Sequence, residues 1–125
     1  MDALLRRALE PVLRDIRLTG ARAPRIEDRE WTDEPSAMMW SDDGTGWGLS
    51  VLRAESDVER VVRAADNVQE WLLEDRWSHG EPTNWPPCPP HPSTHPLTPA
   101  VRDATPRWVC PADGSVVAVI GGLVL

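Results

Sequence analysis

The sequence contains no lysine, no phenylalanine and no tyrosine. All seven aromatic side chains are therefore tryptophans, and the basic side chains are arginines with three histidines. A GC-rich genome explains this bias, since its codons favour Ala, Arg, Pro, Gly and Val. One physical consequence follows for the core: indole rings alone supply its aromatic part, and each buried indole N–H needs a hydrogen-bond acceptor.

Long apolar runs are also missing. Residues 116–125 form the most apolar stretch, which is far short of the ~20 residues that a membrane helix needs. The N-terminus has charged residues every few positions and no apolar segment typical of a signal peptide. We therefore expect a cytoplasmic protein without a membrane partner.

The chain is poor in positive charge, with a formal net charge of −7. Proteins that bind nucleic acid need a basic face for the phosphates, so a nucleic-acid partner is not expected. An acidic surface suits solubility and a basic protein partner.

The length of 125 residues fits one modest core, and the patterning predicts an α+β fold. We expect an α-β-α domain in residues 1–80 and a Pro-rich, zinc-ribbon-like hairpin in residues 81–125 packed on it. The order would be an N-terminal helix, a small antiparallel sheet, a long helix and a zinc-stapled β-hairpin.

Apolar periodicity predicts a helix over residues 2–19, ended by Gly20 and kinked or restarted at Pro11. Its apolar stripe consists of Leu5, Leu9, Val12 and Ile16. A strand over residues 25–31 should follow, and then a hairpin of residues 36–41 and 47–52 around an Asp/Gly turn.

A capping box, Ser56-Asp-Val-Glu59, predicts the start of a second helix that reaches residue 77. Its polar side is acidic, and Trp71 and Trp77 are expected to fold back on the C-terminal segment. His79 then ends the helix as a surface or capping residue.

Eight of the thirteen prolines fall between residues 82 and 99. Residues 99–106 are expected to form a loop or one helical turn. Two β-rich runs, residues 107–110 and 115–120, predict a hairpin around Pro-Ala-Asp-Gly.

Both cysteines and two of the three histidines lie in this last third of the chain. Cys88-Pro-Pro-His91 and Cys110-Pro-Ala-Asp113 repeat one pattern, in which a short turn aims two side chains at one point. Zinc prefers about four N or S ligands in a tetrahedron. We therefore predict one structural Zn²⁺ held by Cys88, His91, His95 and Cys110. Asp113 is the alternative fourth ligand, because it fits the symmetry of the two turns better.

Other interpretations of the same residues remain open. The cysteines could form a disulfide, although nothing in the chain indicates export to an oxidising compartment. Cys110 could be a buried thiol with the histidines in loops, or a Cys–His pair could be catalytic. The proline-rich segment could bind a partner with an aromatic-lined groove.

With a hairpin at its second turn, the Cys/His block resembles a small, degenerate zinc ribbon. The last third of the chain is also similar to the C-terminal part of short uncharacterised actinobacterial proteins. The resemblance rests on Trp85-Pro-Pro-Cys-Pro-Pro-His-Pro, His95-Pro-Leu, Trp108-Val-Cys-Pro and Ile120-Gly-Gly. It implies a bacterial origin and a metal-binding tail, and it implies no reaction.

The sequence therefore favours a non-enzymatic zinc-binding protein, a partner-binding or adaptor module without catalytic residues. The first alternative is a small acidic immunity-type protein that neutralises a basic toxin. The second is a zinc-dependent hydrolase or deaminase with three protein ligands, a water, and Glu81, Asp113 or His79 as base.

Overall fold

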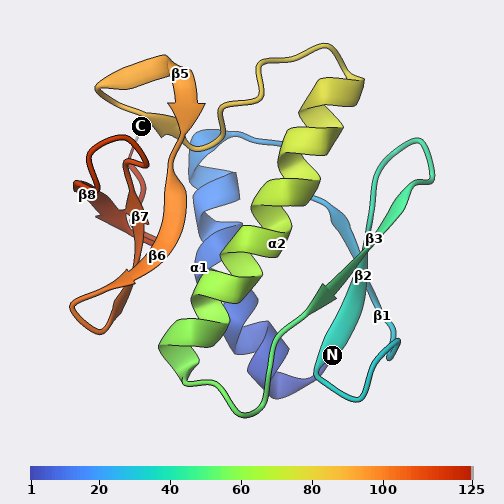
Figure 1. Cartoon of the computed structure of the whole chain (residues 1–125). Helices are drawn as coiled ribbons and strands as arrows, with labels where there is room; N and C mark the ends of the chain where they lie inside the picture. The colour runs from blue at the N-terminus through green and yellow to red at the C-terminus, as the bar shows by residue number, and fades with distance from the viewer. Residues whose placement is uncertain (125) are drawn as a thin grey trace.

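Two helices form the centre of the molecule. The computed structural model describes residues 1–124. Helices α1 (Ala3–Thr19) and α2 (Asp57–Ser78) lie side by side and run in roughly the same direction (Figure 1). The sheet of β1, β2 and β3 lies on one side of the pair, and the C-terminal strands lie on the other (Figure 1). The predicted α+β class and the order of its first elements are confirmed.

Helix α1 matches its prediction closely. The Asp2 side chain caps its N-terminus by accepting a hydrogen bond from the Leu4 amide, and Gly20 ends it at a left-handed φ of 71°. The helix does not restart at Pro11, which lies within one continuous element. The Pro11 ring instead packs closely on the C-terminal turn: a Cβ at Gly121 would lie 2.8 Å from the Pro11 Cβ.

Helix α2 begins at the predicted capping box and ends with His79 as its C-cap. Trp71 is buried, but the prediction for Trp77 was wrong, because its side chain is 72% exposed. Six residues correspond to a rotation of about 240° around an α-helix. Trp77 therefore cannot share the buried face that carries Trp71.

The N-terminal sheet contains β1 (Arg25–Asp28), β2 (Ser36–Trp40) and β3 (Gly46–Ser50), in that order and antiparallel. The predicted hairpin of β2 and β3 is confirmed. Strand β1 ends at Asp28 and not at residue 31. Trp31 has left the ladder, and its indole N–H donates to the Ala37 carbonyl at 2.8 Å.

The C-terminal part contains more strands than the single predicted hairpin. A two-stranded sheet of β4 (Pro87–Cys88) and β5 (His91–Pro96) precedes a three-stranded sheet of β6 (Thr98–Arg102), β7 (Thr105–Val109) and β8 (Val116–Val119). The expected hairpin of β7 and β8 is present. Residues 99–106 are not a loop or a helical turn, because β6 and β7 form a hairpin there. Its two-residue turn is made by Asp103 and Ala104 at positive φ, without the glycine that normally signals it.

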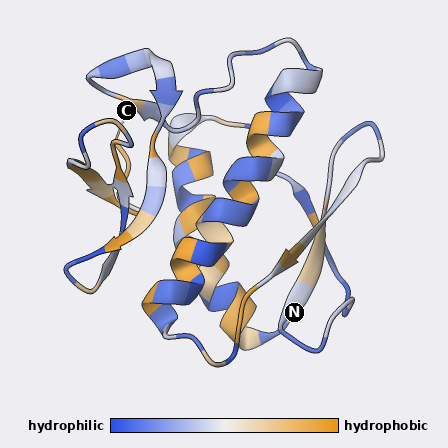
Figure 2. Cartoon of the chain, in the orientation of Figure 1, coloured by the Kyte–Doolittle hydropathy of each residue, from blue (hydrophilic) through white to orange (hydrophobic). Residues whose placement is uncertain are grey.

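One hydrophobic core joins the two halves of the chain. Figure 2 shows apolar and polar residues alternating along both helices, as expected of amphipathic helices. The core contains the predicted α1 stripe and continues into Trp85, Leu97 and Trp108 of the C-terminal part. Neither helix of residues 1–124 has the length and apolar character to cross a membrane.

A buried carboxylate fixes the C-terminal strands to α1. Asp15 is fully buried on this helix. Its Oδ2 accepts hydrogen bonds from the Trp108 indole at 2.8 Å and the Gly121 amide at 2.7 Å, and its Oδ1 accepts one from the Leu123 amide at 3.0 Å. A buried carboxylate is tolerated when N–H donors replace its hydration.

We expect Asp15→Asn to lower the free energy of unfolding by about 2–4 kcal/mol, because the new NH₂ group would face an N–H donor and leave buried groups unpaired. Chemical denaturation measures this loss. Glu10→Gln, an exposed carboxyl on the same helix, is the control and should change stability by less than about 0.5 kcal/mol. A loss below about 1 kcal/mol for Asp15→Asn would show that the carboxylate does not anchor the C-terminal part.

Candidate metal centre

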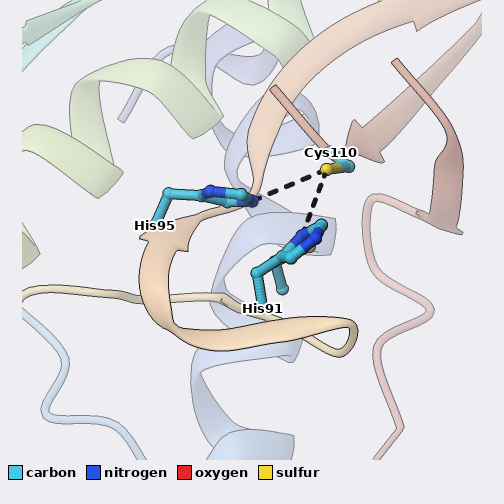
Figure 3. A group of neighbouring side chains, drawn as sticks. His91, His95 and Cys110 are labelled. Carbon is cyan, nitrogen blue, oxygen red and sulfur yellow. Dashed lines mark hydrogen bonds between the residues drawn. The ribbon is translucent and has the colours of Figure 1, made fainter. Parts of the chain in front are cut away.

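Four side chains from the C-terminal part converge on one point. Cys88, His91, His95 and Cys110 each offer one donor atom, and these four atoms all lie within 4.8 Å of one another. Both cysteines are fully buried, while the two imidazoles are half-buried. Figure 3 shows the two histidines pointing toward Cys110 from the curved β5 segment. These are the four residues that the sequence predicts as ligands, and together they could bind a metal ion.

The distances have the scale of a tetrahedral site. Cys88 Sγ lies 3.6 Å from His91 Nδ1. Cys110 Sγ lies 3.8 Å from the same nitrogen and 3.5 Å from His95 Nε2, as the dashed lines of Figure 3 mark. A tetrahedron with zinc–sulfur and zinc–nitrogen bonds of about 2.3 and 2.05 Å has a sulfur–nitrogen edge of about 3.6 Å. These three sulfur–nitrogen separations are therefore close to the edge length of a zinc tetrahedron.

A tight hairpin brings the first two ligands together. Strands β4 and β5 are antiparallel, and Cys88 pairs directly with His91 across the two-residue turn Pro89-Pro90. Directly opposite residues of a hairpin project from the same face of the sheet. The Cys-Pro-Pro-His spacing therefore places a thiol and an imidazole next to each other.

An irregularity in β5 brings in the third ligand. Cys88 pairs with His91, but the next residue back, Pro87, pairs with Pro96. Residues 92–95 therefore bulge out of the ladder, and the strand curls. In a straight strand His95 would lie about 13 Å from His91, whereas here the two ring centroids are 4.9 Å apart.

The fourth ligand comes from the hairpin of β7 and β8. Cys110 directly follows β7 and opens a turn closed by two backbone hydrogen bonds, Gly114 N–H to Cys110 O and Cys110 N–H to Ser115 O, each 2.8 Å. Gly114 has a φ of 75°, which glycine adopts without steric cost.

Core residues anchor both ends of the β4–β5 segment. The buried Gln69 amide on α2 donates to the Trp85 carbonyl at 3.0 Å and to the Leu97 carbonyl at 2.6 Å. The Trp85 indole donates to the Thr19 hydroxyl and packs edge-on against Trp108, with ring centroids 5.6 Å apart. The sequence analysis missed Gln69, although a glutamine beside the apolar stripe of a helix is a signal for a buried polar contact.

Asp113 is not among the four convergent residues. Hydrogen bonds from the side chain and backbone of Ser115, with a smaller one from Cys110, lower the pKa of the Asp113 carboxyl to about 2. Its Oδ1 accepts from the Ser115 amide at 2.9 Å, so the carboxylate orders the turn that carries Cys110.

The two cysteines are free thiols and do not form a disulfide. Burial, and next the neighbouring Cys110 thiol, raise the pKa of the Cys88 thiol. A thiol must lose its proton to bind a metal, so metal binding here would be accompanied by proton release and would weaken at acid pH.

The other candidate bases point elsewhere. His79-Gly80-Glu81 has the His-x-Glu pattern that supplies a ligand and a general acid/base in zinc deaminases. His79 is not one of the four convergent residues; its Nδ1 lies 2.7 Å from the Asp75 carbonyl. Glu81 forms an ion pair with Arg22.

Comparisons with protein-family models, with curated proteins and with solved structures found no match to this chain. The chemistry of the four side chains therefore has to carry the functional interpretation.

Single alanine variants test the ligand set. We expect Cys88→Ala, His91→Ala, His95→Ala and Cys110→Ala each to weaken zinc binding at least about tenfold, because each removes one of the four donor atoms. Asp113→Asn is the matched control: its amide oxygen can still accept the Ser115 N–H, so the variant should bind zinc with affinity near that of the wild type. Competition with a chromophoric chelator measures these affinities. Retention of affinity by His95→Ala together with its loss in Asp113→Asn would replace His95 by Asp113 as the fourth ligand.

Proposed function

We propose that the protein is a non-enzymatic zinc-binding module in which one structural zinc ion, held by Cys88, His91, His95 and Cys110, fixes the proline-rich segment for contact with a partner. One observation carries the proposal: four Cys and His donor atoms converge with sulfur–nitrogen separations of 3.5 to 3.8 Å. A tetrahedral set of two sulfurs and two nitrogens favours zinc over calcium, magnesium and manganese, which prefer oxygen ligands.

The donor count supports a structural role. Zinc with four protein ligands has no open position for water or substrate, whereas a hydrolase or deaminase needs one. Cys88 and Cys110 are fully buried, so an ion between them would be largely shielded from solvent. The hydrolase alternative has less support, because its candidate bases are engaged with other groups: Glu81 pairs with Arg22, His79 Nδ1 lies at the Asp75 carbonyl, and Asp113 accepts the Ser115 N–H.

The ion would replace core packing that this segment lacks. Between residues 87 and 96, Cys88 is the only buried residue; the other side chains are mainly prolines, histidines and small polar groups. Proline limits the freedom of the unfolded segment, which lowers the entropic cost of ordering it around a metal. Zinc would therefore stabilise the β4–β5 hairpin and its connection to Cys110.

Metal removal tests this function. We expect untagged protein to contain about one zinc per chain. Chelation should lower its melting temperature by about 10 °C, because the zinc ion binds only the folded state and its removal takes that stabilisation away. Elemental analysis and thermal melting provide the two readouts. The variant Cys88→Ala/Cys110→Ala, which cannot hold the ion, is the control and should melt at the same temperature with and without chelator. Protein without metal, or a melting temperature unchanged by chelation, would overturn the structural-zinc function.

A second surface, the acidic face of α2, favours a basic partner of the immunity-type alternative. Asp66, Glu70 and Glu74 are exposed and follow each other one turn apart, and the exposed Trp77 continues the same face. Among residues 1–124, none of these three carboxylates lies within 4.0 Å of a basic group. Like charges at this spacing slightly destabilise a helix. A basic partner, including the toxin of an immunity-type pair, would relieve that repulsion.

Charge neutralisation on α2 tests this surface. We expect Asp66→Asn/Glu70→Gln/Glu74→Gln to abolish capture of a basic partner protein at low salt, because it removes the attraction that brings the surfaces together. The control Glu10→Gln/Asp42→Asn/Asp103→Asn has the same net charge and should retain the partner. Wild-type binding should also weaken steeply toward about 0.5 M salt. Equal capture by both triple variants, or binding that does not respond to salt, would exclude this surface.

A further inference from the structure

A cavity of about 490 Å³ lies beside the metal centre. One wall is the segment that carries the ligands, with Trp85, Pro86, Pro87, Pro89, Pro92 and Leu97. The opposite wall comes from β8 and the residues after it, including Val117, Ala118 and Leu123. The lining is therefore mainly apolar, and its volume falls in the range of sites that bind small organic molecules, roughly 300–1,000 Å³.

Among residues 1–124, Arg76 is the only charged side chain that lines this cavity. The chain as a whole has a net charge of −7. The Arg76 guanidinium lies 3.4 Å from the Pro82 carbonyl, and within residues 1–124 it forms no ion pair shorter than 4.0 Å. Most donor groups of this cation are therefore available for an anion.

The other hydrogen-bonding side chains of the lining are already engaged. Thr19 accepts the Trp85 indole N–H and donates to main-chain carbonyls of α1. The Asn84 amide donates to the Pro92 carbonyl. Of the described side chains that line the cavity, Arg76 is thus the one with unused hydrogen-bond donors, and these donors suit a negatively charged group.

We propose that this cavity binds a small organic carboxylate whose apolar body packs between the proline-rich segment and β8 and whose carboxylate pairs with Arg76. An arginine fork matches a carboxylate in shape and charge. A small molecule fits better than a protein surface, because a stable protein interface buries about 1,200–2,000 Å² and extends far beyond a cavity of this size.

Octanoate, an eight-carbon carboxylate, is the probe. We expect it to bind zinc-loaded wild-type protein with a dissociation constant of about 1 mM or below, measured by isothermal titration. In ¹H–¹⁵N spectra the amide signals of Ala118 and Leu123, two residues that line the cavity, should change position on adding octanoate. Acetate lacks the apolar body and 1-octanol lacks the charge, so both should bind at least about tenfold more weakly.

Two variants test where the carboxylate and the apolar body of octanoate bind. Arg76→Gln should weaken octanoate binding about tenfold or more while leaving 1-octanol binding unchanged. The control is Arg17→Gln, which changes an exposed arginine outside this cavity and should leave octanoate binding unchanged. Ala118→Leu should reduce octanoate binding by occupying the cavity, whereas Val116→Leu, an exposed position on the same strand that does not line it, should not.

Three results would overturn the proposal: no octanoate binding by folded wild-type protein, equal binding of octanoate and 1-octanol, or equal octanoate affinity in wild type and Arg76→Gln. Thermal melting of every variant establishes that it is folded. Because zinc content is measured on the same samples, failure of this cavity as a binding site is distinguishable from failure of the zinc function.

Discussion

The buried carboxylate of Asp15 is the interaction on which the C-terminal half of the molecule depends. It lies on α1 and accepts N–H groups from Trp108, Gly121 and Leu123. These donors come from β7 and from the segment after β8, so one side chain sets where this sheet lies against the helices. Cys110 follows Trp108 by two residues, and its position in the metal centre is thereby tied to the helical core. Trp108 also contacts Trp85, which leads into the other ligand-bearing segment.

The candidate metal centre lies between two pieces of chain that the core holds separately. Gln69 ties down both ends of the proline-rich segment, while Asp15 positions the hairpin that ends in Cys110. Between the two Gln69 contacts the segment has few apolar side chains. It carries three of the four donor atoms, and the fourth, that of Cys110, lies on the other piece of chain. A zinc ion would close this link. It would also fix the proline wall beside Arg76, so stability and ligand binding would depend on the same local order.

The sequence predicts the helices and the grouping of Cys88 with His91 well because their signals are local. The capping box at Ser56 and the α1 stripe depend on neighbouring residues, and Cys-Pro-Pro-His is a short turn. Other features depend on the fold as a whole. Strand β6 was missed because Pro99 is its second residue and Asp103-Ala104 forms its turn without glycine. The bulge in β5 brings His95 to the other ligands, and no residue pattern announces it. The three hydrogen bonds that Asp15 accepts likewise come from residues far along the chain, so the sequence around Asp15 does not predict them.

X-ray absorption at the zinc edge of the untagged protein tests the central claim most directly, because it reports the atoms around the ion. We expect two sulfur neighbours at about 2.3 Å and two imidazole nitrogens at about 2.0–2.1 Å, with no water or carboxylate oxygen in the first coordination sphere. This shell would establish a closed site made by both cysteines and both histidines. A shell of nitrogen and oxygen alone, or one with a bound water in place of an imidazole, would contradict it.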